Sequence, residues 1–174
     1  TVFDVDVARM RYIDEVWGGR IGTRFSSPLA VREACGESDV VIGSVLVPGA
    51  RTPHLVDHEM VLGMVPGSVL VDVAVDQGGC FEDSHPTTHA DPTFVVGGSV
   101  FYCVANMPGA VPHTSTYALT NATMRYVLLL ADEGWRGACG SRDDLRRGLA
   151  TCGGKLVSAP VGEALGIECV PVSE

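Results

Sequence analysis

The sequence has 174 residues, 46% of them hydrophobic, and its 12 lysines and arginines against 21 aspartates and glutamates give a net charge of -9. The hydrophobic share is enough for a globular core, whereas nucleic-acid binding needs clustered basic residues, so the composition argues against a nucleic-acid partner. No apolar stretch approaches the roughly 20 residues that cross a bilayer, and no basic-then-apolar leader opens the sequence, so we expect a cytoplasmic protein without membrane contact.

Two strand-and-helix pairs are predicted at the start of the chain. A strand over residues 1–6 precedes a helix over residues 7–17, in which apolar residues recur at helical spacing until a glycine pair ends it. A short strand over residues 20–27 precedes a helix that begins at Pro28, because proline fits the first helical turn.

Further β segments follow. A strand of β-branched residues over 39–49 breaks at a Pro-Gly pair, and a short helix over residues 57–64 leads into the apolar run 68–76. Residues 93–106 add one or two more strand segments. A near-continuous apolar run is typical of a strand covered on both faces. The alternation of strands with short helices therefore predicts the α/β class, with a doubly wound parallel sheet.

The character of the sequence changes at Pro112. Apolar residues at helical offsets predict one long helix over residues 113–135. Residues 136–174 read as short helices and turns, too few for a core of their own. We therefore expect two regions, residues 1–111 with the sheet and residues 112–174 with the long helix.

Cysteines and histidines give no metal signal. The six cysteines show neither a C-x-x-C pair nor a compact disulfide spacing, so we interpret them as reduced small hydrophobic residues. His54/His58 and His85/His89 have the i,i+4 spacing of a helical metal pair, but neighbouring prolines indicate loops or helix entries. We predict no metal site.

Asp4 and Asp6 stand at the end of the first predicted strand. Dinucleotide-binding sheets place an acid at the end of their second strand, where it holds the ribose hydroxyls. Acids also close many strands as solvated turns or helix caps, and this alternative stays open. A G-x-G-x-x-G loop about 20 residues before the acid would support nucleotide binding, and none precedes Asp4.

The segment VLVDVAVDQGG carries two more acids. Side chains alternate across the sheet, so Asp72 and Asp76 share one face about 13 Å apart, at roughly 3.3 Å per residue, which is too far for a close catalytic pair. Asp72 would then lie mid-strand, where burial demands hydrogen bonds and favours a structural role. Asp76 would stand at the carboxyl end beside a glycine pair that permits a tight turn. We interpret Asp76 as the functional acid, with a structural role as the alternative.

Asn106 and Met107 follow another predicted strand and precede a hydroxyl-rich helix entry. The asparagine amide offers a donor and an acceptor, and methionine offers a soft apolar wall for a flat heteroaromatic ring. An ordinary loop with a packed methionine is the alternative.

These segments, taken in order, resemble the NAD-dependent alanine dehydrogenase family essentially from end to end. The resemblance rests on the segments VIGSVLVPGA, DVAVDQGGCFE, PTTHADPTF and YCVANMPGAVPHTSTYALTNAT. Proton-translocating transhydrogenases share the architecture, but NMPGAVPHTSTYALTNAT looks like the dehydrogenase form. The resemblance implies a partial Rossmann-like NAD-binding domain over residues 1–111, from its second strand onward. Residues 112–174 would hold the connecting long helix and the C-terminal part of the substrate domain.

The family interconverts L-alanine with pyruvate and ammonia, using NAD, and is commonly hexameric. By motif position, Asp76 would stand beside nicotinamide and substrate, where it moves protons or stabilises a cationic imine. The resemblance implies contacts with the rest of NAD by residues along the chain: Asp4 with the adenosine ribose, Arg9 and Ser26 near adenosine, Val45 and Leu46 at the middle, and Val73, Asn106 and Met107 at the nicotinamide end.

The resemblance covers only the back half of the family. The Gly-rich loop and the front domain, with its substrate-binding Arg and Lys and a catalytic His, have no match in this sequence. The central strand of the sheet is also unmatched, so its two neighbours would present open edges, and we expect an isolated 174-residue polypeptide to be unstable, to aggregate or to borrow a strand. A catalytically inactive remnant or interaction partner is therefore the alternative to an enzyme, and a transhydrogenase NAD-binding domain is a third, less favoured one.

Overall fold

The computed structural model describes residues 1–47 and 50–171, which divide into two compact units. The first unit comprises Thr1–Val45 and Thr52–Ala105, and the second comprises the rest of the described chain. The functional division between residues 111 and 112 stays a prediction. No helix among the described residues has the length and apolar character needed to cross a membrane.

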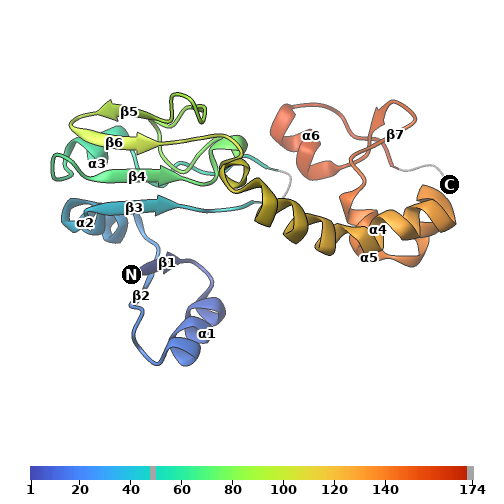
Figure 1. The fold of residues 1–174 in the computed structure, drawn as a ribbon, viewed down its shortest axis with the longest axis horizontal. Coiled ribbons are helices and arrows are strands. Elements are labelled where there is room, and N and C mark those ends of the chain that lie inside the picture. Colours follow the sequence, from blue (N-terminus) through green and yellow to red (C-terminus); the bar gives the residue numbers. More distant parts are fainter. Residues whose placement is uncertain (48–49, 172–174) are drawn as a thin grey trace. The chain divides into compact units, whose positions relative to one another are not determined.

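The first unit holds two sheets built mainly from parallel strands (Figure 1). β1 (Val2–Asp4) pairs in parallel with β2 (Thr23–Phe25), and these two strands form one sheet. The second sheet has the order β3-β4-β6-β5. Its strands are β3 (Val40–Gly43), β4 (Val69–Asp72), β6 (Ser99–Tyr102) and β5 (Thr93–Val96), all parallel except β5. The predicted α/β class with a parallel sheet is confirmed, and within the described chain β1 and β3 are edge strands.

Several of the expected strands are shorter than the sequence suggested. β3 ends at Gly43 instead of running to residue 49, and the Pro-Gly pair expected to break it lies outside the described residues. β4 ends at Asp72, so the prediction that its pleat continues to Asp76 is wrong. The segment 93–106 forms an antiparallel hairpin, because Gly97 and Gly98 adopt φ values of 58° and 91° that a tight turn requires.

The helices of the first unit begin at the capping residues that the sequence supplies. α1 (Val7–Trp17) is capped by Asp6, whose Oδ1 accepts from the backbone N–H groups of Ala8 and Arg9 at 2.9 and 3.0 Å. α2 (Pro28–Glu37) and α3 (His58–Leu62) are capped in the same way by Ser27 and Asp57. Side-chain caps fix where each helix starts, and hence where the loops before them leave the strands.

The core of the first unit lies around β4, β6 and α3. Val61, Leu70 and Phe101 are fully buried, and the Phe101 ring packs edge-on against Phe81 at 6.1 Å and stacks on Phe94 at 5.0 Å. Each such side chain contributes about 1.5 to 3 kcal/mol by leaving water. This packing joins β4 and β6 to α3.

The second unit is helical. Its long helix α4 (Pro112–Ser141) runs further than predicted and contains one residue with non-helical torsion angles, Gly134, at φ 68° and ψ 168°. The 3-10 helix η2 (Met107–Ala110) precedes α4, and α5 (Asp143–Gly148), β7 (Thr151–Cys152), β8 (Lys155–Leu156) and α6 (Ala159–Leu165) follow it. Asp144 of α5 accepts hydrogen bonds from Arg142 and from the hydroxyl of Tyr126 on α4, and these bonds hold the pKa of Asp144 well below its ordinary value.

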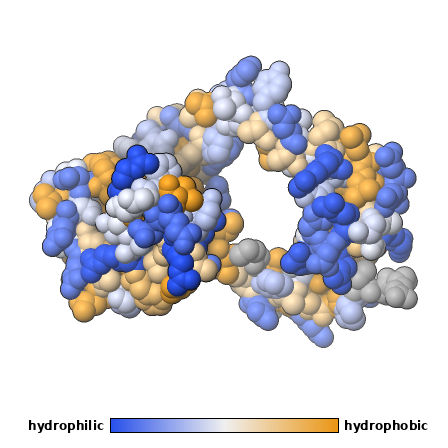
Figure 2. Space-filling view, turned by 90° about the horizontal axis from the view of Figure 1, so that it is seen from below, coloured by the Kyte–Doolittle hydropathy of each residue, from blue (hydrophilic) through white to orange (hydrophobic). Residues whose placement is uncertain are grey.

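Large apolar side chains remain on the surface of both units. Figure 2 shows orange apolar atoms interspersed with blue polar ones over the visible face. Leu29 and Leu119 are each 67% exposed, and Ile42 of β3 is 64% exposed. Single apolar side chains at a surface are ordinary, but an exposed isoleucine on an edge strand favours pairing with a further strand.

Candidate functional site

The predicted site residues of the first unit lie at the carboxyl ends of parallel strands. Asp4 is the last residue of β1, and Ser26 directly follows β2. Val45 lies two residues after β3, and Val73 directly follows β4. Ligands of open α/β sheets bind outside these strand ends, so the topology agrees with a binding role for this group.

Asp4 and Ser26 are connected through the backbone. The Ser26 N–H donates to the Asp4 carbonyl at 2.9 Å, and Oδ1 of the Asp4 carboxylate accepts from the Asp6 N–H at 2.9 Å. The sequence left open which acid holds a ligand, and the structure uses Asp6 as the helix cap. Asp4 is half-buried. A carboxylate accepts about four hydrogen bonds, so the Asp4 carboxylate can accept more than the one bond from the Asp6 N–H that holds the turn.

Arg9 lies in the first turn of α1, with its guanidinium 5.4 Å from the centre of the Tyr12 ring. Its side chain is exposed and it shares the β1-α1 corner with Asp4. A cation stacked on an aromatic face is held in place at modest cost. The corner therefore combines one carboxylate and one guanidinium on neighbouring elements.

The loop after β3 is anchored by Thr52, which sequence reasoning did not single out. Its buried hydroxyl donates to the Val45 carbonyl at 3.3 Å, and its N–H donates to the Gln77 carbonyl at 2.8 Å. Thr52 thus connects the end of β3 with the turn that follows β4. Leu46 is exposed and belongs to the second unit.

Asp72 is the buried anchor of the segment after β4. Its Oδ1 accepts from the Ala74 N–H at 3.0 Å, and its Oδ2 accepts from the Cys80 N–H at 2.8 Å and from the Ser84 hydroxyl at 2.6 Å. A fourth, longer bond of 3.4 Å comes from the Phe81 N–H. The bond to Ala74 curls the chain directly after the strand, which is why the expected alternation to Asp76 fails. Asp72 is structural as predicted, but it stands at the end of the strand and not in its middle.

Asp76 lies in the 3-10 helix η1 (Val75–Gln77). The hydrogen bonds of Asp72 to Ala74 and Cys80 lie on either side of this helix in the sequence. Its side chain is exposed, and Gly78 and Gly79 follow with φ values of 102° and 82°. The prediction that this glycine pair makes a tight turn is confirmed. A Cβ at Gly79 would lie 2.8 Å from Asp72 Oδ2, so the backbone must pass close to the buried carboxylate.

Asn106 and Met107 lie in the second unit, at the start of η2. Asn106 adopts the left-handed conformation at φ 54° and ψ 52°, the one described non-glycine residue with positive φ. Asparagine tolerates this conformation better than most residues. The structure thus joins Asp4 with Ser26, and Val45 with the η1 turn through Thr52, while the Asn106 pair stands in a separate unit.

Among the described residues, no group of three or more His, Cys, Asp or Glu side chains could hold a metal ion. Cys35, Cys80 and Cys103 are buried, and burial raises the pKa of each thiol, which keeps them protonated and unreactive. His58 pairs with Asp83 at 3.0 Å, and this hydrogen bond raises the pKa of the imidazole.

Comparison with known proteins matches this architecture to one family. Residues 1–159 match the family described as "Alanine dehydrogenase/PNT, C-terminal domain". The chain belongs to this family.

Relatives in the alanine dehydrogenase/PNT family share much of the sequence. The alanine dehydrogenase of Mycolicibacterium smegmatis is 59% identical over 165 residues, which cover 95% of this chain and 44% of the relative. The alanine dehydrogenase of Halomonas elongata is 55% identical, with 98% of this chain and 46% of the relative covered. The chain therefore spans less than half the length of the curated relatives it matches.

Solved structures agree with the family assignment. An L-alanine dehydrogenase structure superposes with a TM-score of 0.79 at 46% identity, and covers 94% of this chain and 45% of that one. A transhydrogenase from Sinorhizobium meliloti superposes with a TM-score of 0.63 at 27% identity, and covers 90% and 41%. The dehydrogenase is the closer of these two in both sequence and structure.

Proposed function

We propose that this chain forms the NAD-binding and C-terminal part of an NAD-dependent alanine dehydrogenase. The complete enzyme would interconvert L-alanine with pyruvate and ammonia. The observation that carries the proposal is the family match together with two carboxylates beside strand ends, Asp4 as the last residue of β1 and Asp76 in the turn that follows β4. These are the places where an open α/β sheet binds a dinucleotide.

The donor set of the first unit suits the ribose end of NAD. Ribose hydroxyls donate hydrogen bonds, and the Asp4 carboxylate has acceptor capacity beyond the bond from Asp6. Ser26 is fixed to Asp4 by its backbone bond, and Arg9 presents a cation at the same corner. We assign Asp4 to the ribose hydroxyls, with Arg9 and Ser26 beside adenosine.

The other predicted contacts follow the remaining strand ends. Val45 and Leu46 would line the middle of the cofactor, and Val73, Asn106 and Met107 the nicotinamide end. Val73 is 52% exposed although it is apolar, which agrees with a surface meant to be covered by a flat ring.

Asp76 is assigned a catalytic role in the conversion of alanine. Bound NAD supplies the acceptor for a hydride, and a substrate amine that loses hydride becomes a cationic imine. An exposed carboxylate on a turn that is fixed from beneath by Asp72 can stabilise this positive charge, or take up a proton, without first reorganising. The glycine pair behind it keeps side chains out of the turn.

Assembly and location extend the same proposal. The family suggests a homo-oligomer, commonly a hexamer, in the cytoplasm. Exposed apolar residues along α4, such as Leu119, Val127 and Leu128, agree with a helix that packs against another subunit. Sedimentation of the hybrid enzyme described next would report its subunit number.

A hybrid enzyme tests the function directly. This chain replaces the matched 165-residue segment of the Mycolicibacterium smegmatis alanine dehydrogenase, and alanine-dependent reduction of NAD is measured. We expect turnover within about tenfold of the parent enzyme. The matched control carries Asp76→Asn and defines the background rate. A hybrid that folds and binds NAD like its parent, yet shows no reduction above that background, would contradict the proposal.

A further inference from the structure

Residues 52–58 run alongside the chain that follows the 3-10 helix η1. The Thr52 N–H donates to the Gln77 carbonyl at 2.8 Å. Three residues further on, the Leu55 N–H donates to the Cys80 carbonyl at 2.7 Å. Paired backbone groups fix two segments relative to each other. The turn that carries the proposed catalytic carboxylate is therefore supported on its C-terminal side by residues 52–58.

Thr52 also holds the end of β3. Its side chain is buried, with 4% of the residue exposed, and its hydroxyl donates to the Val45 carbonyl at 3.3 Å. The two residues are seven positions apart in the chain, so this bond closes the base of the loop between them. A buried carbonyl that loses its donor is costly, because water does not readily replace the missing partner. Thr52 therefore uses its hydroxyl toward β3 and its N–H toward η1.

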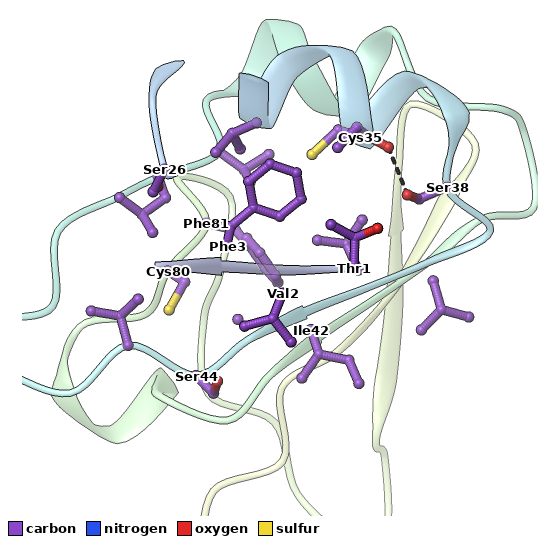
Figure 3. A pocket seen from close by; sticks show the side chains of 18 residues that line it. Thr1, Val2, Phe3, Ser26, Cys35, Ser38, Ile42, Ser44, Cys80 and Phe81 are labelled. Carbon is purple, nitrogen blue, oxygen red and sulfur yellow. Dashed lines mark hydrogen bonds between the residues drawn. The ribbon is translucent and has the colours of Figure 1, made fainter. Parts of the chain in front are cut away.

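The end of β3 and residues 52–58 meet at one place in the first unit. A Cβ at Gly43, the last residue of β3, would lie 2.6 Å from the Cβ of Cys80, so the two backbones approach each other closely. Figure 3 shows Ser44 and Cys80 lining a cavity of about 390 Å³, and Val45 and Leu55 belong to the same lining. The Thr52 bonds thus connect segments that already lie side by side.

We propose that Thr52 is a positioning residue of the dehydrogenase reaction, which holds the cofactor-contacting end of β3 in place relative to the turn that carries Asp76. The proposal rests on the proposed function, which assigns Val45 to the middle of NAD and Asp76 to the catalytic step. Hydride transfer requires a fixed geometry between cofactor and substrate, and a small displacement from a distant substitution lowers the rate. One residue bonded to both elements sets their spacing.

A purely structural role for Thr52 predicts a different result. If the threonine only stabilised the fold, its substitution would lower the fraction of folded molecules and leave the NADH affinity and turnover of the folded ones unchanged. A positioning residue changes both quantities in molecules that remain folded. NADH affinity and turnover, each referred to the folded fraction, therefore separate the two roles.

Two substitutions in the hybrid enzyme isolate the hydroxyl. Thr52→Val keeps the shape and the N–H but removes the hydroxyl donor, whereas Thr52→Ser keeps the donor. We expect Thr52→Val to raise the NADH dissociation constant about fivefold and to lower kcat about tenfold, and Thr52→Ser to change each by less than about twofold. Fluorescence titration with NADH gives the dissociation constant without catalysis, and alanine-dependent reduction of NAD gives kcat.

Ser99→Ala is the matched control. The hydroxyls of Ser99 and Ser68 are both buried and lie 2.8 Å apart in a hydrogen bond at the amino end of the strands. Its loss should lower the free energy of unfolding and leave NADH binding and kcat unchanged. An unchanged dissociation constant or kcat in Thr52→Val, or an equal effect of Thr52→Ser, overturns the proposal.

Hydrogen exchange decides if Thr52→Val does not fold. In the unaltered hybrid, NADH should slow exchange of the Thr52 amide at least about fivefold more than that of the Val100 amide. The Val100 N–H donates to the Ser68 carbonyl at 2.8 Å, at the opposite end of the strands. Equal slowing overturns the proposal. An unaltered hybrid that binds NADH without reducing NAD contradicts the proposed function instead, and the dissociation constants still decide on Thr52.

Discussion

The hydroxyl of Ser84 donates a 2.6 Å hydrogen bond to the buried carboxylate of Asp72, twelve residues earlier in the chain. Together with the bonds from Ala74 and Cys80, it closes the segment that carries Asp76 into a fixed loop. The position of the proposed catalytic carboxylate therefore depends on a second carboxylate that no ligand needs to touch.

Asp72→Asn should destabilise the first unit by about 2 to 4 kcal/mol. Both carboxylate oxygens accept hydrogen bonds, so either orientation of an amide turns its NH₂ group toward a donor. Urea unfolding of the hybrid enzyme measures the loss. Asp132→Asn, at an exposed site on α4, is the control and should change stability by less than about 0.5 kcal/mol. Equal effects of the two substitutions would contradict a structural role for Asp72.

Gly79→Ala should destabilise the protein more than Gly67→Ala. Both glycines have positive φ, at 82° and 92°, so both substitutions carry a backbone cost of about 1 to 3 kcal/mol. Only the Cβ at position 79 meets close neighbours, Asp72 Oδ2 at 2.8 Å and Ser84 Cβ at 2.9 Å, whereas nothing lies within 4 Å at position 67. The difference between the two unfolding free energies isolates the packing cost, and a difference of zero would refute the close approach.

The His58–Asp83 pair should make stability depend on pH. Asp83 raises the folded-state pKa of His58, chiefly through its hydrogen bond, above the ordinary value of about 6.5. The stabilisation is therefore fully present below about pH 6.5 and is lost as the pH rises through the raised pKa. NMR titration of the imidazole should show a lower pKa in Asp83→Asn. Glu59→Gln, which removes a weaker influence, should lower it less; an unchanged pKa in Asp83→Asn would disprove the pairing.

Asp76→Asn in the hybrid enzyme should lower kcat by about 10²- to 10⁴-fold, the usual contribution of a positioned acid or base. An uncharged amide neither takes up the proton nor stabilises the cationic imine. Steady-state kinetics with saturating alanine and NAD provide the measurement. Turnover close to that of the unaltered hybrid would contradict a catalytic role for Asp76.

Asp4→Asn should raise the KM for NAD by roughly tenfold with little change in kcat, because the ribose contact is the same in the ground and transition states. Asp6→Asn is the matched control two residues away. Asparagine caps helices as well as aspartate does, so α1 should keep its start and the KM should stay unchanged. If the two substitutions raise the KM equally, the ribose assignment fails.

Much of the fold could be read from the sequence because local signals there were strong. Asp6, Ser27 and Asp57 cap helices that begin where the apolar periodicity begins, and Gly18 ends α1 as expected. Strand ends were less predictable. The apolar run continues past Asp72, and the chain turns there because the Asp72 carboxylate accepts hydrogen bonds from Ala74 and from the distant Cys80 and Ser84.

The candidate site was predicted in part for the same reason. Asp4 and Asp76 are recognisable because an acid after an apolar run is a local pattern. Thr52 was missed because its role is to connect the β3 loop with the turn after β4, and nothing nearby in the sequence marks this contact. A threonine in a loop next to a proline carries no signal of its own in the sequence, because its partner Gln77 is 25 residues away.

The non-helical torsion angles of Gly134 interrupt both the course of α4 and its helix dipole. Two shorter helix dipoles replace one long one, and the first places its negative end just before Gly134. Asp132 and Glu133 add their own negative charge at that end, where cations would be favourable. The negative end of the first helix and the positive end of the second therefore meet at Gly134, so the two acids lie unfavourably for the first dipole and favourably for the second.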